Sequence, residues 1–164
     1  THSAILNPKD FSKIALLEQF GNRIAVFDFP RKMISAFFES KDSLFYGHGA
    51  FSLDGKYLVT TERAYDRSFG RLTVRNSNTL MPARIISSHG FWPHDICFLG
   101  KDVIVVTNQG NPAREQPSSI CYIDFESGNL LKKIESKNKN EMLSHLTKIS
   151  DSKVLITSIG IRYR

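Results

Sequence analysis

The sequence predicts an all-β fold: a β-propeller of four-stranded blades, of which this chain covers about three and a half blades, roughly half of a seven-bladed ring. Two observations predict this fold. Histidine recurs at a nearly constant interval, and short apolar runs follow each histidine in a repeated order. Repeats of about 40 to 50 residues, each with four short strands, are typical of propeller blades. A β-sandwich with accidental spacing is the alternative.

The first element of each unit is marked by a histidine. These histidines are separated by 46, 46 and 51 residues, and they are His2, His48, His94 and His145. We expect each of them to begin the innermost strand of a blade. The predicted units are residues 2–47, 48–93 and 94–143, followed by an incomplete unit at 144–164.

The second element is a compact apolar run. It begins nine residues after three of the histidines, as YLVTTE at Tyr57, VIVVTN at Val103 and VLITSI at Val154. In the first unit the matching run IALLEQ begins at Ile14, twelve residues after the histidine. Three extra residues in the preceding loop explain this offset. The runs are short and rich in β-branched residues, which favours strands over helices.

The third and fourth elements complete each unit. The third runs are RIAVFD from Arg23, RLTVRN from Arg71 and SICYID from Ser119, and each ends on Asp or Asn, whose side chains favour turns. The fourth runs are MISAFFE, ARIISS and LLKKIE. The chain therefore holds three complete units and a fourth of two strands, which ends in GIRYR.

An incomplete ring has consequences for partners. A propeller closes when its last blade packs against its first, and open blade faces expose apolar patches and an unpaired strand edge. We therefore expect either self-association with a second copy or the missing remainder of the ring to cover these faces.

The composition argues against two classes of partner. The net charge is +6, but the basic residues are scattered rather than gathered on one face with aromatic residues between them, which disfavours nucleic-acid binding. No apolar run approaches the roughly 18 residues that span a bilayer, so no membrane insertion is expected. The two cysteines, Cys97 and Cys121, lie in apolar runs without metal-ligand spacing and are expected to be free thiols.

Strand pairing predicts which polar residues meet. The start of a first strand and the end of the antiparallel second strand lie at the same rim, so the four histidines should surround one mouth of the channel. Their predicted neighbours at the ends of the second strands are Gln19, Glu62 and Asn108. The loop that follows adds Tyr65, Asp66 and Arg67, a mixture suited to a polar ligand. Asp95 is expected to point to the opposite face of its strand from His94.

The histidines allow two interpretations. Imidazole is the commonest metal ligand, and His48 and His94 are candidates to hold a transition metal, with Glu62 as an acceptor that orients a ligating ring. Alternatively, each ring donates to a backbone carbonyl of the neighbouring blade and has a structural role only. The repetition favours the structural role, because structural roles recur in every blade.

The sequence contains no convincing catalytic motif, so it gives little support for an enzyme. The chain has no G-x-S-x-G elbow, Walker loop or H-E-x-x-H helix. The residues favour a non-enzymatic ligand-binding or scaffold propeller and name no cofactor. The alternative is a lactonase-like propeller hydrolase with His48 and Glu62 as general base.

Two stretches carry a family resemblance. FYGHGAFSLDGKYLVTTERAYD from Phe45 and GFWPHDICFLGKDVIVVTNQG from Gly90 resemble a bacterial propeller family designated domain of unknown function 1513, within the WD40-like (YVTN) propeller superfamily. The resemblance covers essentially the whole chain. It implies a seven-bladed protein exported to the periplasm, with genes beside those for imelysin-like and iron-uptake proteins. It implies no catalytic residue.

Overall fold

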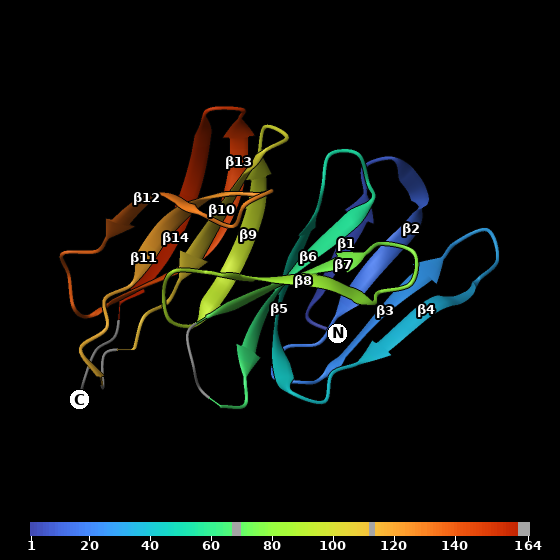
Figure 1. Cartoon of the computed structure of the whole chain (residues 1–164), viewed down its shortest axis with the longest axis horizontal. Coiled ribbons are helices and arrows are strands. Elements are labelled where there is room, and N and C mark those ends of the chain that lie inside the picture. Colours follow the sequence, from blue (N-terminus) through green and yellow to red (C-terminus); the bar gives the residue numbers. More distant parts are fainter. Residues whose placement is uncertain (67–69, 112–113, 161–164) are drawn as a thin grey trace.

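The structure is a computed structural model that describes residues 1–66, 70–111 and 114–160. These ranges form three four-stranded antiparallel sheets and one two-stranded sheet, each with its strands in sequence order. Figure 1 shows the sheets side by side, with blue β1–β4 at one end and orange to red β11–β14 at the other. This arrangement confirms the predicted β-propeller of four-stranded blades. None of the described residues forms a helix of the length and apolarity needed to cross a membrane.

We refer to the four sheets as blades 1 to 4. Blade 1 consists of β1 (Ser3–Asn7), β2 (Asp10–Leu17), β3 (Arg23–Asp28) and β4 (Met33–Glu39). Blade 2 consists of β5 (Ser43–Phe51), β6 (Tyr57–Ala64), β7 (Arg71–Asn76) and β8 (Pro82–Ser87). Blade 3 consists of β9 (Pro93–Leu99), β10 (Val103–Asn108), β11 (Ser119–Asp124) and β12 (Leu130–Glu135). Blade 4 consists of β13 (Glu141–Ser150) and β14 (Lys153–Gly160).

The third strands end where the sequence predicts, because the side chain at each end starts a turn. Asp28 Oδ1 accepts the N–H of Arg31 at 3.0 Å, and Asp124 Oδ1 accepts the N–H of Ser127 at 2.8 Å. Asn76 Oδ1 does the same for Asn78 at 3.0 Å. These local bonds compete with the ladder and stop the strand.

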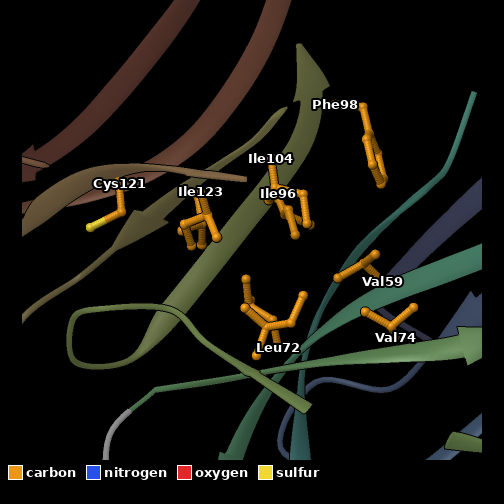
Figure 2. Packing of buried hydrophobic residues seen from close by; sticks show 10 residues of the cluster. Val59, Leu72, Val74, Ile96, Phe98, Ile104, Cys121 and Ile123 are labelled. Atoms are coloured by element: carbon orange, nitrogen blue, oxygen red, sulfur yellow. The ribbon is translucent and has the colours of Figure 1, made fainter. Parts of the chain in front are cut away.

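The hydrophobic core lies between neighbouring blades. Val59, Leu72 and Val74 of blade 2 belong to one buried cluster with side chains of blade 3, among them Ile96 and Ile104 (Figure 2). A second cluster joins blades 1 and 2, and its fully buried members include Leu17 and Phe45. Burial of these side chains removes apolar surface from water and fixes the angle between blades.

Each innermost strand of blades 2 to 4 carries an irregularity at its histidine. In β9 the partner of Asn108 is Pro93 and the partner of Thr107 is Asp95, so His94 stands as an extra residue. In β5, residues 46–48 face Thr61 alone, and in β13 residues 144–145 face residue 157 alone. Such bulges re-aim side chains.

The bulges change the predicted strand boundaries. β5 begins at Ser43 and β13 at Glu141, so His48 and His145 lie within their strands rather than at the start. The predicted unit boundary between residues 47 and 48 therefore falls inside β5. In blades 1 and 3 the histidine stands near the beginning of the strand, because His2 directly precedes β1 and His94 is the second residue of β9.

Candidate metal centre

Four imidazoles from four blades lie together on the innermost strands. His2, directly before β1, has its Nε2 atom 3.1 Å from Nε2 of His48. The ring centroids of His48 and His94 are 4.8 Å apart, and His145 lies 4.9 Å from each of them. His48 stands at the middle of this group, which we call the histidine cluster.

The spacing of the nitrogens suits a metal ion. His48, His94 and His145 each offer one ligand atom, and these atoms lie within 4.8 Å of one another. Two imidazole nitrogens on one zinc ion, each about 2.0–2.1 Å from it, are separated by about 3.3 Å in a tetrahedral site. The 3.1 Å between Nε2 of His2 and Nε2 of His48 is close to this value, and the ligand atoms of the other two rings lie within 4.8 Å of that of His48.

Threonines hold the bulges that carry the histidines. Thr61 Oγ1 donates to the carbonyl of His48 at 3.1 Å and lies 3.2 Å from the carbonyl of His94 in the next blade. Thr107 Oγ1 lies 2.5 Å from the carbonyl of Ser144 in blade 4. Thr157 Oγ1 accepts the N–H of His145 at 3.2 Å. The threonines therefore fix the innermost strands, and two of them connect neighbouring blades.

The connection of blades through threonine hydroxyls differs from the structural role considered for the histidines, in which each ring donates to a backbone carbonyl of the neighbouring blade. In the described ranges, one imidazole bonds a backbone carbonyl: His89 Nε2 lies 3.1 Å from the carbonyl of Gly128, and His89 is outside the histidine cluster. Next to the cluster, the backbone carbonyls of the neighbouring blade are contacted by threonine hydroxyls. The nitrogens of the cluster are left to interact with one another and with Asp95.

Asp95 lies within the cluster. Its Oδ1 atom is 3.5 Å from Nδ1 of His48, and its Oδ2 atom is 3.6 Å from Nδ1 of His145. The prediction that Asp95 points to the opposite face of its strand from His94 is wrong: the bulge at His94 interrupts the alternation of side chains, and the carboxylate lies beside the same two rings that contact His94. The sequence does hold one signal: Asp95 is the acidic residue among the positions that follow the four histidines, the others being Ser3, Gly49 and Leu146.

The electrostatics favour neutral imidazoles. Burial, together with smaller contributions from the neighbouring His145 and His2, lowers the pKa of His48 to about 4. Burial also lowers the pKa of His94 to about 4, with contributions from His48 and His145. At neutral pH both rings therefore keep the free lone pair that metal coordination requires.

His94 also carries an unsatisfied polar atom. The residue is 5% exposed, and its Nδ1 atom is buried without a hydrogen-bond partner. Buried polar atoms without partners are rare in folded proteins, since each costs about 1–3 kcal/mol. This orphaned nitrogen, beside the nitrogens of two other rings, is consistent with a site for a bound group.

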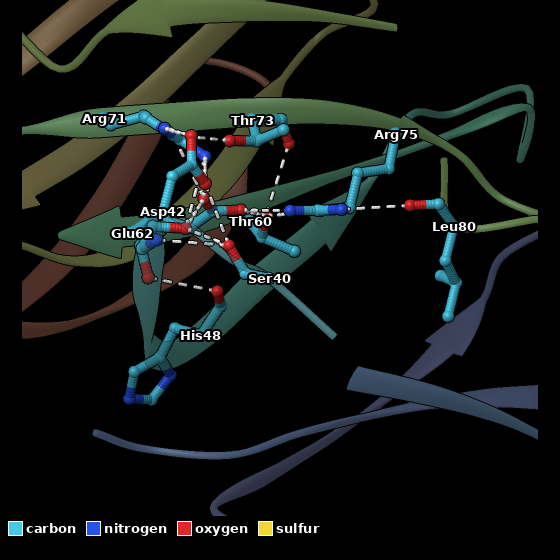
Figure 3. Close-up of polar contacts among 11 residues, drawn as sticks. Ser40, Asp42, His48, Thr60, Glu62, Arg71, Thr73, Arg75 and Leu80 are labelled. Carbon is cyan, nitrogen blue, oxygen red and sulfur yellow. Dashed lines mark hydrogen bonds and ion pairs between the residues drawn. The ribbon is translucent and has the colours of Figure 1, made fainter. Parts of the chain in front are cut away.

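Glu62 is not part of the cluster. It is fully buried, and its carboxylate accepts from Ser43 Oγ at 2.7 Å and Thr60 Oγ1 at 2.8 Å. The guanidinium groups of Arg75 and Arg71 lie 2.6 and 3.0 Å from it (Figure 3). In the described part of the chain no hydrogen bond or ion pair joins Glu62 to His48.

The bulge in β5 explains this separation. Glu62 pairs with Phe45 rather than with His48, because three residues of β5 face Thr61. The prediction that Glu62 neighbours His48 is therefore wrong, whether Glu62 was to orient a ligating ring or to act as general base.

The other predicted rim residues lie apart from one another. Asn108 is fully buried and donates to the carbonyl of Ser88, in the connection between blades 2 and 3, at 3.1 Å. Gln19 forms an isolated bridge with Tyr46. Tyr65 and Asp66 are exposed in the turn after β6, and Arg67 lies outside the described residues.

Comparison with known proteins identifies a family and a fold. A family model described as "Protein of unknown function (DUF1513)" matches residues 1–159. No curated protein sequence matches the chain.

Two solved structures share the propeller fold. The crystal structure of BamB from Moraxella catarrhalis superposes with a TM-score of 0.66 at 14% identity, covering 95% of this chain and 41% of BamB. The structure of U3-55K superposes with a TM-score of 0.67 at 13% identity, covering 87% of this chain and 41% of U3-55K. The chain thus spans about two fifths of the length of each.

Proposed function

Because the chain belongs to the DUF1513 family, whose function is unknown, we propose a function from the site itself: this protein is a non-enzymatic β-propeller that binds a transition-metal ion. We assign His48, His94 and His145 as the ligands, and His2, whose Nε2 atom lies 3.1 Å from Nε2 of His48, is the candidate for a fourth. The observation that supports the proposal is the approach of these imidazoles from separate blades to within 4.8 Å.

The donor set suggests the class of metal. All the candidate ligands are imidazole nitrogens, which suit Zn, Cu, Ni and Fe rather than Mg or Ca. The divalent affinities of such a site rise from Fe²⁺ to Cu²⁺ and fall again at Zn²⁺. Zn²⁺, Ni²⁺ and Cu²⁺ are therefore the probes of choice for binding measurements, and Fe²⁺ is expected to bind more weakly.

We further propose that the protein acts in metal acquisition in the periplasm. The support is the histidine cluster together with the family resemblance of the two long stretches that begin at Phe45 and Gly90. A fusion of the full-length protein to a reporter enzyme that is active only outside the cytoplasm tests the location. Growth of a deletion strain under metal limitation tests the role.

The hydrolase alternative has no support in this geometry. It required a general base formed by His48 and Glu62, and the carboxylate of Glu62 is enclosed by two guanidinium groups and two hydroxyl groups. We therefore do not propose a hydrolytic activity.

The test of metal binding uses protein purified without an affinity tag and stripped with a chelator. Titration calorimetry with Zn²⁺ is expected to show one ion per chain, and His48→Ala and His94→Ala are expected to lower the affinity at least 100-fold. His89→Ala is the matched control, because His89 lies outside the cluster. If the unmodified protein binds no Zn²⁺, Ni²⁺ or Cu²⁺, or if the cluster variants bind as tightly as the control, the proposal is wrong.

A further inference from the structure

We propose that Asp95 is the positioning residue of the metal centre: its carboxylate holds the Nδ1 sides of His48 and His145, so that both rings present Nε2 to the ion. The inference rests on the proposed metal binding and assigns a role to a residue that is not itself a predicted ligand. It replaces Glu62 as the carboxylate that orients ligating imidazoles.

The carboxylate reaches two rings at once. Oδ1 lies 3.5 Å from Nδ1 of His48 in blade 2, and Oδ2 lies 3.6 Å from Nδ1 of His145 in blade 4. Asp95 itself belongs to blade 3. One side chain therefore contacts histidines of both neighbouring blades, each through the same ring atom.

The carboxylate is itself fixed. Oδ1 accepts the backbone N–H of Ile96 at 2.8 Å, and Oδ2 accepts the backbone N–H of Leu146 at 3.0 Å. Its side chain is 14% exposed. Two backbone donors thus hold the carboxylate in one orientation, which is what a group that orients other ligands requires.

The arrangement determines which nitrogen faces the ion. With Nδ1 of His48 directed at Asp95, the Nε2 atom of the same ring lies on the far side, 3.1 Å from Nε2 of His2. An acceptor at Nδ1 selects the tautomer with its proton on that atom and leaves the lone pair on Nε2. The carboxylate also supplies a negative charge beside the histidine cluster, which partly compensates the charge of a divalent cation.

Asp95 differs from a residue that only stabilises the fold. The N–H bonds from Ile96 and Leu146 account for its structural role, and an asparagine side chain retains an acceptor for one of them. The two backbone bonds already fix the carboxylate, and they do not require it to approach two Nδ1 atoms as well. This approach is explained if the rings must be oriented toward a common ligand.

The experiment compares Asp95→Asn with the unmodified protein by Zn²⁺ titration and by the visible absorption of bound Co²⁺. We expect a 10- to 100-fold loss of Zn²⁺ affinity and a shifted Co²⁺ spectrum, because the ligand field changes when the rings are no longer held. Asp102→Asn, an exposed substitution in the turn of the same blade, is the control and is expected to change neither measurement.

The outcomes separate this inference from the proposed function. If the unmodified protein binds no metal, the proposed function fails and the inference fails with it. If the unmodified protein binds Zn²⁺ and Asp95→Asn binds it equally well with an unchanged Co²⁺ spectrum, the inference alone is overturned. Should Asp95→Asn unfold in chelator, Asp95→Glu keeps the charge and moves the carboxylate, and an affinity equal to that of the unmodified protein overturns the inference.

Discussion

His48 and His94 differ from surface histidines because burial keeps them neutral. Their pKa values of about 4 lie below the ordinary value of 6.5, and His145 contributes to both shifts. A folded state with a lowered histidine pKa binds fewer protons than the unfolded state between these pH values. Its free energy of unfolding therefore falls as the pH falls.

We predict that the two rings make the metal-free protein lose stability between pH 6.5 and pH 4, by on the order of 3 kcal/mol. The groups that face the two rings are His2, His145 and Asp95. Urea unfolding in chelator at a series of pH values measures the effect. The double variant His48→Gln, His94→Gln is expected to show a flatter profile, and an equal slope in both proteins would contradict the prediction.

A substitution of Gly47 tests whether Zn²⁺ binding depends on the position of the His2 ring. Gly47 has a φ of +95°, and a Cβ atom added there would lie 2.6 Å from Cδ2 of His2 and 3.0 Å from Cβ of Gln19. We predict that Gly47→Ala destabilises the protein by about 2 kcal/mol and weakens Zn²⁺ binding, because the added methyl group displaces the His2 ring.

The control for Gly47→Ala is Gly100→Ala. Gly100 also has a positive φ, +67°, but nothing lies within 4 Å of an added Cβ. This variant carries the backbone strain without the clash, so it is expected to cost about 1 kcal/mol and to bind Zn²⁺ normally. Equal Zn²⁺ affinities in the two variants would show that the His2 ring is not displaced.

The residue scale also shows what the sequence could and could not predict. The interval between histidines predicts that they occupy equivalent positions, and the structure brings the four together. The interval between histidines could not predict that Asp95 lies in the histidine cluster or that Glu62 lies outside it. Both depend on bulges, which shift the side chains of a strand and leave no residue pattern that distinguishes them from regular pairing.

At the scale of the strand, the bulges depend on threonine. Thr61 Oγ1 contacts the carbonyl groups of His48 and His94, which belong to two different blades. We predict that Thr61→Val, which keeps the shape of the side chain, lowers the free energy of unfolding by about 1–2 kcal/mol, because the one hydroxyl donor shared by these two carbonyl groups is lost.

Urea unfolding of Thr61→Val beside Thr147→Val measures this cost. Thr147 is an exposed threonine of β13, so its substitution is expected to change stability by no more than about 0.5 kcal/mol. If the two variants are equally stable, the hydroxyl of Thr61 does not hold the bulge.

Glu62 and Arg75 connect β6 to β7 inside blade 2 and reach blade 1. Both side chains are fully buried, and the Arg75 guanidinium lies 4.3 Å from the ring centroid of Phe38 in β4. We predict that Glu62→Gln costs about 3–5 kcal/mol, because it leaves buried guanidinium groups without their counter-charge. Zn²⁺ affinity is expected to stay unchanged in the protein that remains folded.

The comparison for Glu62→Gln is Asp42→Asn. Asp42 also pairs with Arg71, whose hydrogen bond lowers the pKa of Asp42 to about 2, but the aspartate side chain is 66% exposed. Solvent screens this pair, so the substitution is expected to cost at most about 1 kcal/mol. If Glu62→Gln is as stable as the unmodified protein but no longer binds Zn²⁺, Glu62 belongs to the metal site and the prediction is wrong.

The strands themselves were well predicted by the sequence. β3, β7, β10, β11 and β12 begin and end at the predicted residues. The reason is that each of these strands lies between strong turn signals, which fix both of its ends. The innermost strands were less well predicted, since β5 holds polar and glycine residues and its start is fixed by the blade rather than by its own pattern.

At the scale of the molecule, the two outer blades present apolar side chains. Ile34 and Phe37 of β4 are exposed, as are Leu155 and Ile159 of β14. Such patches are rarely left uncovered in monomers, and β14 also forms the edge of a two-stranded sheet. We propose that a second copy or further blades of the ring cover them.

We predict that the 164-residue chain self-associates at micromolar concentration, and that Phe37→Lys combined with Leu155→Lys shifts it toward the monomer. Sedimentation velocity over a range of concentrations measures the mass. The control is Phe11→Lys with Met81→Lys, which adds equal charge at exposed apolar positions of β2 and of the turn before β8. A single monomeric species at all concentrations would contradict the prediction.

Each imidazole of the cluster is carried by a different blade, so the separations of their nitrogens follow from the angle between adjacent blades. A ring built from more blades turns through a smaller angle at each step and has a wider channel. The metal affinity of the histidine cluster therefore depends on the angle between adjacent blades, and so on the number of blades in the ring. Related proteins that gain or lose a blade elsewhere in the ring would retain these four histidines and still change in affinity, because the histidines would stand farther apart or closer together.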